Sequence, residues 1–386
     1  MKVALVHHWL TGMRGGEKVL EALCELFPEA DIFTLVCDAS RISEKLRRHR
    51  IVTSFIQRLP MGRTKFRGYL PLFPMAAGRW DFSGYDLVLS CDASLVKAVR
   101  VAEGTPHVCY CHSPPRYLWD LYELYRREEA SAMQRLFMPV VARYLRGVDY
   151  RAAQRVGHFV ANSRAVAGRI AEHYGREATV VYPPVETGYY GEGLRGQGAK
   201  GPRDQGSKGS RVQGDEGAYY LFVGQLVAYK KADLAIAALT GMGRRLIVAG
   251  DGPQRGRLEK LARGEVTFAG SVSDERLREL YAGCRALVFP NEEDFGIVPV
   301  EAQAAGAPVI ALGKGGGLET VVDGVTGVHF SEQSVAGLEG AVRRFEEMEG
   351  RLSVEACRAN AQRFEKGVFF EAMREYVATV MEGRRD

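Results

Sequence analysis

The sequence has few cysteines and no long apolar run, and both features narrow the class of protein. No stretch of about 18 uncharged apolar residues occurs, so we expect no membrane-spanning helix. The seven cysteines are odd in number and lack the spacing of a disulfide framework, which favours free thiols in a reducing compartment. Residues 1–10 are too few for a signal peptide and fit a first buried strand. We therefore expect a cytoplasmic protein.

A strong excess of one charge is also missing. The net charge of +5 over 386 residues favours anionic partners only mildly, and no nucleic-acid-binding module is recognisable, so we expect no nucleic acid as a partner. Residues 47–67 stand out because basic and apolar residues interleave there. This pattern fits a solvated basic face first, and a peripheral contact with anionic head groups on the inner face of the cell membrane second.

Metal-ligand spacing is missing as well. Cys109, Cys111 and His112 form a C-x-C-H pattern without the second ligand pair that a structural zinc site needs. A dinucleotide fingerprint is incomplete in the glycine-rich segment 250–256, because Arg255 stands where the third glycine is required. We therefore expect neither a metal nor a nicotinamide cofactor.

The chain length and the order of its apolar runs predict two α/β domains. A chain of 386 residues exceeds one ordinary hydrophobic core. Short apolar runs alternate with helical patterns in both halves, which predicts doubly wound parallel sheets covered on both faces. Glycine recurs throughout residues 191–217, and this segment has almost nothing to bury, so we expect a flexible loop or linker.

The expected strands of the first half cover residues 3–7, 32–35, 87–90, 107–110, 158–161 and 179–182. Those of the second half cover residues 219–223, 246–249, 266–269, 286–289, 309–311 and 327–330. We expect helices at 17–26, 148–155, 257–262, 274–282, 300–305 and 364–382.

The segment 291–301, N-E-E-D-F-G-I-V-P-V-E, carries the strongest functional signal. It follows the apolar run 286–289, so Glu293 lies just beyond a buried strand and Glu301 about one turn into the next helix. Ligands of open parallel sheets bind beyond the carboxyl ends of the strands. Two carboxylates at that edge can bind paired hydroxyl groups.

Residues 293–310 resemble the sugar-nucleotide signature of glycosyltransferase family 4, the retaining enzymes of the GT-B fold. The resemblance covers nearly the whole chain except residues 191–217, and it implies two Rossmann-like domains that face each other across a cleft. It places an acceptor-binding domain at 1–186, joined by a C-terminal helix at 364–386. The segment 187–217 is then the linker, and 218–363 the nucleotide-sugar-binding domain.

The resemblance implies roles for the residues that match the family signature. Glu293 would hold the hydroxyls of the donor sugar, and Glu301 the ribose of the nucleotide. The backbone at Phe295, Gly296 and Ile297 would face the sugar and the phosphates. The glycine loop 313–317 could add backbone N–H groups to the diphosphate, or it could be a tight turn.

The segment V-G-Q-L-V-A-Y-K-K resembles the family pattern in which an arginine and a lysine neutralise the departing diphosphate. Lys230 matches that lysine, and Lys231 follows it. Gln225 stands where arginine is usual, so one charged contact to phosphate is lost. Ser271 and Val272 match the region beside the nucleobase.

Two further motifs of the first half fit the resemblance. The glycine-rich turn T-G-M-R-G-G opens a helix, and Gly15 and Gly16 there would lie beside the donor phosphates. His112, in C-Y-C-H-S-P-P-R-Y-L-W-D, would contact the donor sugar at the reaction face. Ser163 follows a predicted strand and is better explained as a helix N-cap than as a catalytic residue.

The expected function is retaining hexosyl transfer without a metal ion or other cofactor. The first choice is transfer of mannose from GDP-mannose to a glycan or lipid-linked saccharide, because the signature resembles the O-antigen mannosyltransferases of polysaccharide biosynthesis. Catalysis would rest on His112, Lys230 and Glu293. Alternatives are a UDP-sugar-dependent transferase, a sugar-nucleotide epimerase and an inactive nucleotide-sugar-binding protein. A glycoside hydrolase fits less well, because its two carboxylates must flank the scissile bond.

Overall fold

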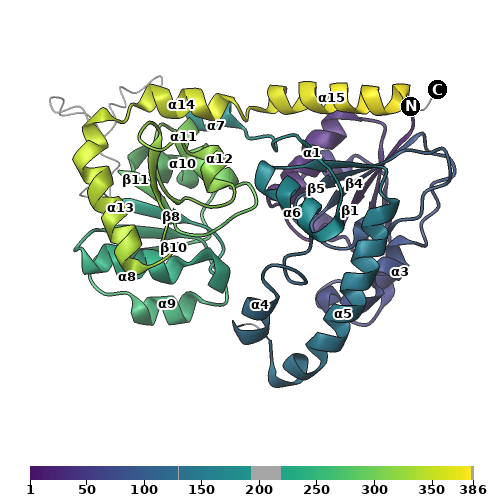
Figure 1. Ribbon diagram of the computed structural model, residues 1–386, viewed down its shortest axis with the longest axis horizontal. Coiled ribbons are helices and arrows are strands. Elements are labelled where there is room, and N and C mark those ends of the chain that lie inside the picture. The colour runs from purple at the N-terminus through teal and green to yellow at the C-terminus, as the bar shows by residue number, and fades with distance from the viewer. Residues whose placement is uncertain (129, 193–218, 384–386) are drawn as a thin grey trace. The chain divides into compact units, whose positions relative to one another are not determined.

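The computed structural model describes residues 1–128, 130–192 and 219–383. The chain forms two compact units (Figure 1). Unit 1 consists of Met1–Pro184 and Gly367–Asp386, and unit 2 of Val185–Lys366. Most of the predicted glycine-rich linker, from residue 193 to 217, lies outside the described residues.

Unit 1 contains a seven-stranded parallel sheet in the order β3-β2-β1-β4-β5-β6-β7. Its strands are β1 (Val3–His7), β2 (Asp31–Thr34), β3 (Ile51–Thr53), β4 (Leu87–Asp92), β5 (His107–Cys111), β6 (His158–Ala161) and β7 (Thr179–Val180). The central strands β1, β4 and β5 are buried at every position, because helices cover both faces of the sheet.

The helices of unit 1 are α1 (Gly15–Leu26), α2 (Glu44–Arg47), α3 (Phe73–Ala77), α4 (Tyr122–Glu128), α5 (Ala132–Arg155), α6 (Arg164–Tyr174) and α15 (Lys366–Glu382). The 3-10 helices in the described part of this unit are η1 (Ala39–Arg41), η2 (Phe55–Arg58), η3 (Phe66–Leu72) and η4 (Val96–Ala98). Helix α6 begins where the Ser163 hydroxyl accepts a hydrogen bond from the Val166 N–H at 3.1 Å, which confirms the predicted N-cap.

Two hydrophobic layers enclose the sheet of unit 1. On one face, α1 and α15 pack against the central strands, with Leu20, Leu89 and Met373 in the same cluster. On the other face, α3 and the second half of α5 pack through Phe73 and Leu145. The C-terminal helix α15 therefore completes a core whose strands come from the other end of the chain.

Unit 2 contains a six-stranded parallel sheet in the order β10-β9-β8-β11-β12-β13. Its strands are β8 (Tyr220–Val223), β9 (Leu246–Ala249), β10 (Val266–Gly270), β11 (Ala286–Phe289), β12 (Val309–Leu312) and β13 (Gly327–Phe330). Its helices are α7 (Thr187–Glu192), α8 (Ala232–Gly241), α9 (Arg255–Leu261), α10 (Asp274–Gly283), α11 (Ile297–Ala304), α12 (Gly317–Thr320), α13 (Val335–Met348) and α14 (Val354–Gln362), with η5 (Ala228–Lys230) and η6 (Glu349–Arg351).

Both sheets are doubly wound, which confirms the predicted fold class. In each sheet the strand order reverses once, between β1 and β4 in unit 1 and between β8 and β11 in unit 2. The loops that leave such a pair of strands diverge, and the edge of the sheet between them stays open to ligands. Among the described residues, none of the helices is long and apolar enough to cross a membrane.

Helix α5 differs most from the sequence prediction. It begins at Ala132, whereas the pattern predicted a helix only from 148 to 155. Its first half carries Pro139 and has apolar residues that face solvent, so the buried periodicity of an ordinary amphipathic helix starts only at Ala142. The short edge strand β3 was also not predicted, because its three residues are only partly buried.

We expect that the core contacts of α15 stabilise unit 1. Phe369 is 2% exposed, and its ring packs against that of Tyr110 with centroids 6.0 Å apart. Phe369→Ala should lower the free energy of unfolding by about 3–5 kcal/mol, because it leaves a cavity. Urea denaturation measures this change. Val368→Ala, at the exposed neighbouring position, is the matched control, and equal effects of both substitutions would contradict the packing.

Candidate functional site

The candidate site of unit 2 lies where the order of its sheet reverses. Lys230 is in the loop that follows β8, and Glu293 is in the loop that follows β11. The Lys230 ammonium and the Glu293 carboxylate form an ion pair. Asn291 donates a further hydrogen bond from Nδ2 to Glu293 Oε1 at 2.6 Å. The side chains of Lys230 and Glu293 are 18% and 17% exposed, so they are ordered by contacts and still open to a ligand.

The N-terminus of α11 lies beside this ion pair in the sequence. Gly296 precedes the helix with a φ of +89°, and a Cβ there would lie 3.1 Å from the Phe289 ring, so only glycine fits. The free N–H groups of the first helical turn and the helix dipole favour an anion. The Phe295 side chain is buried against the Phe364 ring, so it supports the loop and leaves only backbone for a ligand.

Glu301 is held differently from Glu293. It is 5% exposed, and Tyr281 donates a hydrogen bond from its hydroxyl to Glu301 Oε2 at 3.0 Å. The rings of Tyr190 and Tyr281 meet edge to face at 5.7 Å. Burial and then the Glu301 charge raise the pKa of both tyrosines, so both hydroxyls stay protonated near neutral pH. Glu301 was predicted from the sequence, but Tyr190 and Tyr281 were not, because nothing in their spacing marks them.

The glycine loop 313–317 packs directly on the loop that carries Glu293. The Gly316 N–H donates to the Glu293 carbonyl at 2.9 Å. A Cβ at Gly316 would lie 1.9 Å from the Phe295 carbonyl oxygen, so only glycine permits this approach. The loop is therefore a tight turn that fixes the backbone of 293–295, which is one of the two roles that the sequence left open.

The remaining predicted donor-binding residues of unit 2 follow the neighbouring strands. Gln225 is exposed directly after β8, and Lys231 directly precedes α8 with a φ of +57°. Ser271 and Val272 follow β10. All of them lie at the same carboxyl edge of the sheet as Lys230 and Glu293, because all strands of this sheet are parallel.

A second cluster lies at the carboxyl edge of the sheet in unit 1. A Cβ on Gly16 would lie 3.4 to 3.9 Å from the rings of His7, His8 and His112, so three imidazoles surround the N-terminus of α1. Gly15 is the first residue of that helix. Glu17 Oε2 accepts from the Arg14 N–H at 3.1 Å, which turns its buried carboxylate back toward the histidines.

The charges of this histidine cluster follow from its burial. Burial and then the charge of His7 lower the pKa of His112 to about 4, so its imidazole is neutral near pH 7. Burial alone would raise the pKa of Glu17, but the imidazoles of His7 and His8 hold it at about 2. Among the described residues, both ring nitrogens of His7 and Nδ1 of His8 lack a hydrogen-bond partner. His112 and Gly16 were predicted as site residues, whereas His7, His8 and Glu17 were not. The adjacent histidines at the end of the first strand were the available signal for His7 and His8.

A buried ion triad fixes the backbone next to His112. Lys97 Nζ lies 2.5 Å from Asp149 Oδ1 and 3.1 Å from Asp92 Oδ2, and all three side chains are at most 1% exposed. Burial opposes the ionisation of Lys97, but the two carboxylates outweigh it and raise the pKa of Lys97 well above its ordinary value. Asp92 ends β4, and its carbonyl accepts from the His112 N–H at 2.8 Å.

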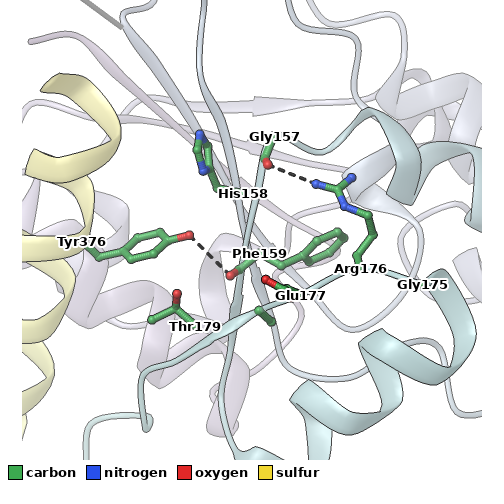
Figure 2. Close-up of a pocket in the computed structure, with 9 residues that line it drawn as sticks. Gly157, His158, Phe159, Gly175, Arg176, Glu177, Thr179 and Tyr376 are labelled. Carbon is green, nitrogen blue, oxygen red and sulfur yellow. Dashed lines mark hydrogen bonds between the residues drawn. The ribbon is translucent and has the colours of Figure 1, made fainter. Parts of the chain in front are cut away.

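A pocket of about 540 Å³ lies at the opposite edge of the sheet in unit 1, and Figure 2 shows residues that line it. Its lining comes from the starts of β6 and β7, from the loop at Arg176 and from Tyr376 of α15. The Arg176 guanidinium donates to the Gly157 carbonyl at 3.1 Å, and Tyr376 donates to the Phe159 carbonyl at 3.4 Å. Ligands of parallel sheets bind at the carboxyl edge, so this cavity is separate from the candidate site.

Two protein-family models match the chain and show which family it belongs to. The model described as Glycosyltransferase Family 4 matches residues 13–189, and the model described as Glycosyl transferases group 1 matches residues 207–364. The chain belongs to these glycosyltransferases.

Curated relatives and solved structures agree with this family. The chain is 39% identical over 137 residues to glycogen synthase of Mycobacterium tuberculosis, covering 33% of each protein. It is 31% identical over 247 residues to D-inositol 3-phosphate glycosyltransferase of Acidothermus cellulolyticus, covering 58% of this chain and 51% of that protein. The matched regions thus span about half or less of the length of these relatives.

The solved structures show the GT-B fold. Anabaena Alr3699/HepE in complex with UDP-glucose matches with a TM-score of 0.68 at 18% identity, over 98% of this chain and 100% of that chain. Sucrose-phosphate synthase of Thermosynechococcus elongatus matches with a TM-score of 0.71 at 19% identity, over 99% and 100%. At these identities the likeness concerns the fold, and it confirms the GT-B prediction for this family 4 chain.

The side-chain types that bind metal ions do not gather into a metal site in the described part of the chain. Among the residues that the structure describes, no group of three or more histidine, cysteine, aspartate or glutamate side chains is placed to hold one. Glu293 of the acidic triplet 292–294 is paired with Lys230 instead. Cys109 and Cys111 are buried in β5, where burial raises the pKa of the Cys111 thiol well above its ordinary value.

The stability of unit 1 should depend on pH through its histidines of lowered pKa. Burial lowers the pKa of His107 and His112 to about 4, whereas the unfolded chain titrates at its ordinary value of 6.5. The unfolded state therefore binds more protons between these values, and stability present above pH 6.5 is lost as the pH falls toward 4. We expect a loss of roughly 2 kcal/mol per histidine between pH 6.5 and pH 5.

Urea denaturation at steps across that range measures this loss. Glu17 does not contribute there, because its pKa falls from 4.5 to about 2 and its share of the stability is lost only below 4.5. The Ser90 hydroxyl lies 2.8 Å from His107 Nε2, and His107→Asn keeps a polar group beside it. This variant should reduce the slope of the unfolding free energy against pH by the share of one histidine. An unchanged slope in this variant would contradict the assignment.

Proposed function

We propose that this family 4 glycosyltransferase transfers mannose from GDP-mannose, with retention of configuration, to a glycan or lipid-linked saccharide. The observation that carries the proposal is the cluster of Lys230, Glu293 and Asn291 at the point where the sheet order of unit 2 reverses. A cation, a carboxylate and an amide at one open edge offer the groups that bind a diphosphate and a sugar together.

Lys230 and the N-terminus of α11 would stabilise the leaving diphosphate. The bond between the anomeric carbon and the diphosphate oxygen breaks, the acceptor oxygen bonds to the same face of that carbon, and the acceptor proton passes to the leaving diphosphate. Negative charge grows on the leaving group along this path, and only contacts that strengthen with it lower the barrier. The Lys230 ammonium exchanges part of its contact with Glu293 for the phosphate oxygens, and the partial exposure of both side chains permits this.

The two glutamates would divide the donor between them. Glu293, freed in part from Lys230, accepts hydrogen bonds from the sugar hydroxyls, and Asn291 keeps it oriented. Glu301, whose Oε2 accepts from the Tyr281 hydroxyl, would also accept hydrogen bonds from the ribose hydroxyls. The backbone at Phe295, Gly296 and Ile297 would face the phosphates, and Ser271 with Val272 the base.

Unit 1 would supply His112, Gly15 and Gly16 to the same reaction. The low pKa of His112 makes its imidazole neutral, so it would act as a hydrogen-bonding group to the donor sugar rather than as a cation. Cys91 Sγ lies 2.9 Å from His112 Nε2 and orients the ring. The N–H groups at the start of α1 would add contacts to phosphate.

The charge of the leaving group would be met by side chains, without a metal ion or cofactor. Gln225 offers phosphate a hydrogen bond without charge, so Lys230 bears more of the stabilisation than in a site with both cations. Lys231 lies next in the chain and is partly exposed, so it is the nearest replacement in sequence.

Similarity to two mannosyltransferases supports mannose as the sugar of the donor. The chain is 35% identical over 138 residues to the GDP-mannose-dependent phosphatidylinositol monomannoside mannosyltransferase of Mycobacterium tuberculosis, covering 31% of this chain and 36% of that protein. It is 47% identical over 75 residues to the mouse mannosyltransferase ALG2, covering 17% and 18%. The UDP and UDP-glucose bound to HepE favour the competing proposal of a UDP-sugar donor.

A nucleotide panel separates these donors. We expect the melting temperature to rise with GDP and GDP-mannose, and less with UDP, ADP or their glucose and N-acetylglucosamine conjugates, because a ligand that binds only the folded state stabilises it. Glu301→Ala should weaken binding about tenfold or more by removing a charged hydrogen-bond acceptor. Glu347→Ala, on the exposed side of α13, is the control. A selective response to UDP would establish the competing donor, and no response to any nucleotide would overturn the transferase.

Lys230→Gln tests the leaving-group role. We expect kcat for GDP release to fall by about 10²–10³-fold, with a smaller change in KM, because the contact between Lys230 and the diphosphate strengthens in the transition state. Lys260→Gln, at an exposed position of α9, is the matched control. The measurement is GDP release from GDP-mannose with and without a saccharide acceptor. Equal kcat values for both variants would exclude Lys230 from the reaction.

A further inference from the structure

The first half of α5 presents an apolar stripe to solvent. Its side chains are between 53% and 74% exposed, and they are Met133, Leu136, Phe137, Val140 and Tyr144. They recur at three- and four-residue spacing, which places them on one side of the helix within an arc of about 100°. Burial of this kind of stripe normally holds a helix on its domain, yet here the stripe faces away from the core.

Local contacts hold this half of α5 in place. A capping box begins the helix, in which Ser131 and Gln134 each bond the other's backbone N–H. Arg135 donates to the carbonyl oxygens of Arg127 and Ala130 at 2.7 and 3.1 Å, which ties the first turn to α4. Figure 1 shows these first turns extending away from the sheet of unit 1. The stripe is thus displayed on a formed helix.

The same side of α5 becomes basic toward its C-terminal end. Arg151 and Arg155 continue the line of the stripe by helical spacing, and both are exposed. Arg143 flanks the stripe and is also exposed. Asp149 is the one acidic residue in the sequence of α5, and it is buried against Lys97 on the inner side. The exposed face therefore combines apolar and positive groups without a negative one.

We propose that this face of α5 docks on a bilayer surface that contains anionic phospholipid. The apolar stripe enters the boundary between head groups and acyl chains, where Phe137 and Tyr144 suit the mixed environment, and the arginines contact the phosphates. A second copy of the chain fits less well, because two such faces would bring arginines together without acidic partners. The proposal is independent of the donor site in unit 2.

The structure places the docking surface elsewhere than the segment 47–67. Ile56 and Phe66 of that segment are buried in the core of unit 1, at 0% and 6% exposure, so they are not available to lipid. Arg50 is paired with Asp31, and Arg48 with Glu44. The segment offers exposed charge, whereas α5 offers both charge and an apolar face.

Vesicle flotation of the full chain tests the proposal. We expect the chain to float with vesicles of phosphatidylglycerol and phosphatidylcholine in equal parts, and not with pure phosphatidylcholine. Leu136→Ser with Phe137→Ser should weaken the apparent vesicle affinity about tenfold or more, because it removes apolar surface that would enter the bilayer. Val322→Ser with Val335→Ser, two exposed positions of unit 2 at 39% and 40%, is the matched control and should float like the unchanged chain.

Further readouts keep the test decisive if the double serine variant is less stable. Arg151→Gln with Arg155→Gln keeps the stripe and should shift flotation toward that seen with neutral vesicles, with a weaker dependence on salt. Unchanged flotation in both double variants of α5 would overturn the proposal. A second result would also overturn the proposal: the unchanged chain binds no lipid but forms a concentration-dependent dimer in light scattering, and the double serine variant does not. The stripe would then be an interface between two copies.

Discussion

The parallel pairing of β8 with β11 is the constraint on which the candidate site depends. Both strands point the same way, and the chain continues from them toward opposite sides of the sheet. Their loops must therefore diverge, and the edge between them cannot be covered by a direct crossover. Lys230 and Glu293, far apart in sequence, become an ion pair only because of this reversal. The glycine loop after β12 then fixes the Glu293 backbone, because Gly316 allows an approach that any side chain would prevent.

Burial separates the ion pairs that can exchange a partner from those that cannot. In unit 1, Lys97, Asp92 and Asp149 are fully enclosed, and removal of one of them would leave a buried charge without compensation, at a cost of about 3–5 kcal/mol. In unit 2, Lys230 and Glu293 keep nearly a fifth of their surface in water, so each charge can be solvated while its partner contacts a ligand. The first group is suited to holding structure, and the second to binding an anion and a sugar in turn.

The sequence predicted the features that depend on local pattern. The buried strands, the doubly wound class, the N-cap at Ser163 and the carboxylates at 293 and 301 all follow from apolar runs and spacing. Contacts between distant segments could not be predicted, because local pattern does not show which segments meet. They are Tyr190 and Tyr281 at Glu301, the Lys97 triad, and the imidazoles of His7 and His8 around Gly16. The first half of α5 was missed for a different reason, because its apolar residues do not face the core of the domain.

Helix α5 connects its exposed face with the surroundings of His112 through buried charge. Asp149 lies on the inner side of the helix and pairs with Lys97, which also pairs with Asp92 at the end of β4. The Asp92 carbonyl in turn accepts from the His112 N–H. The three charged side chains are buried, so they hold α5 and the end of β4 together. A surface docked through α5 would therefore hold the histidine cluster at a fixed distance from the head groups, which suits the lipid-linked saccharide among the two proposed acceptors.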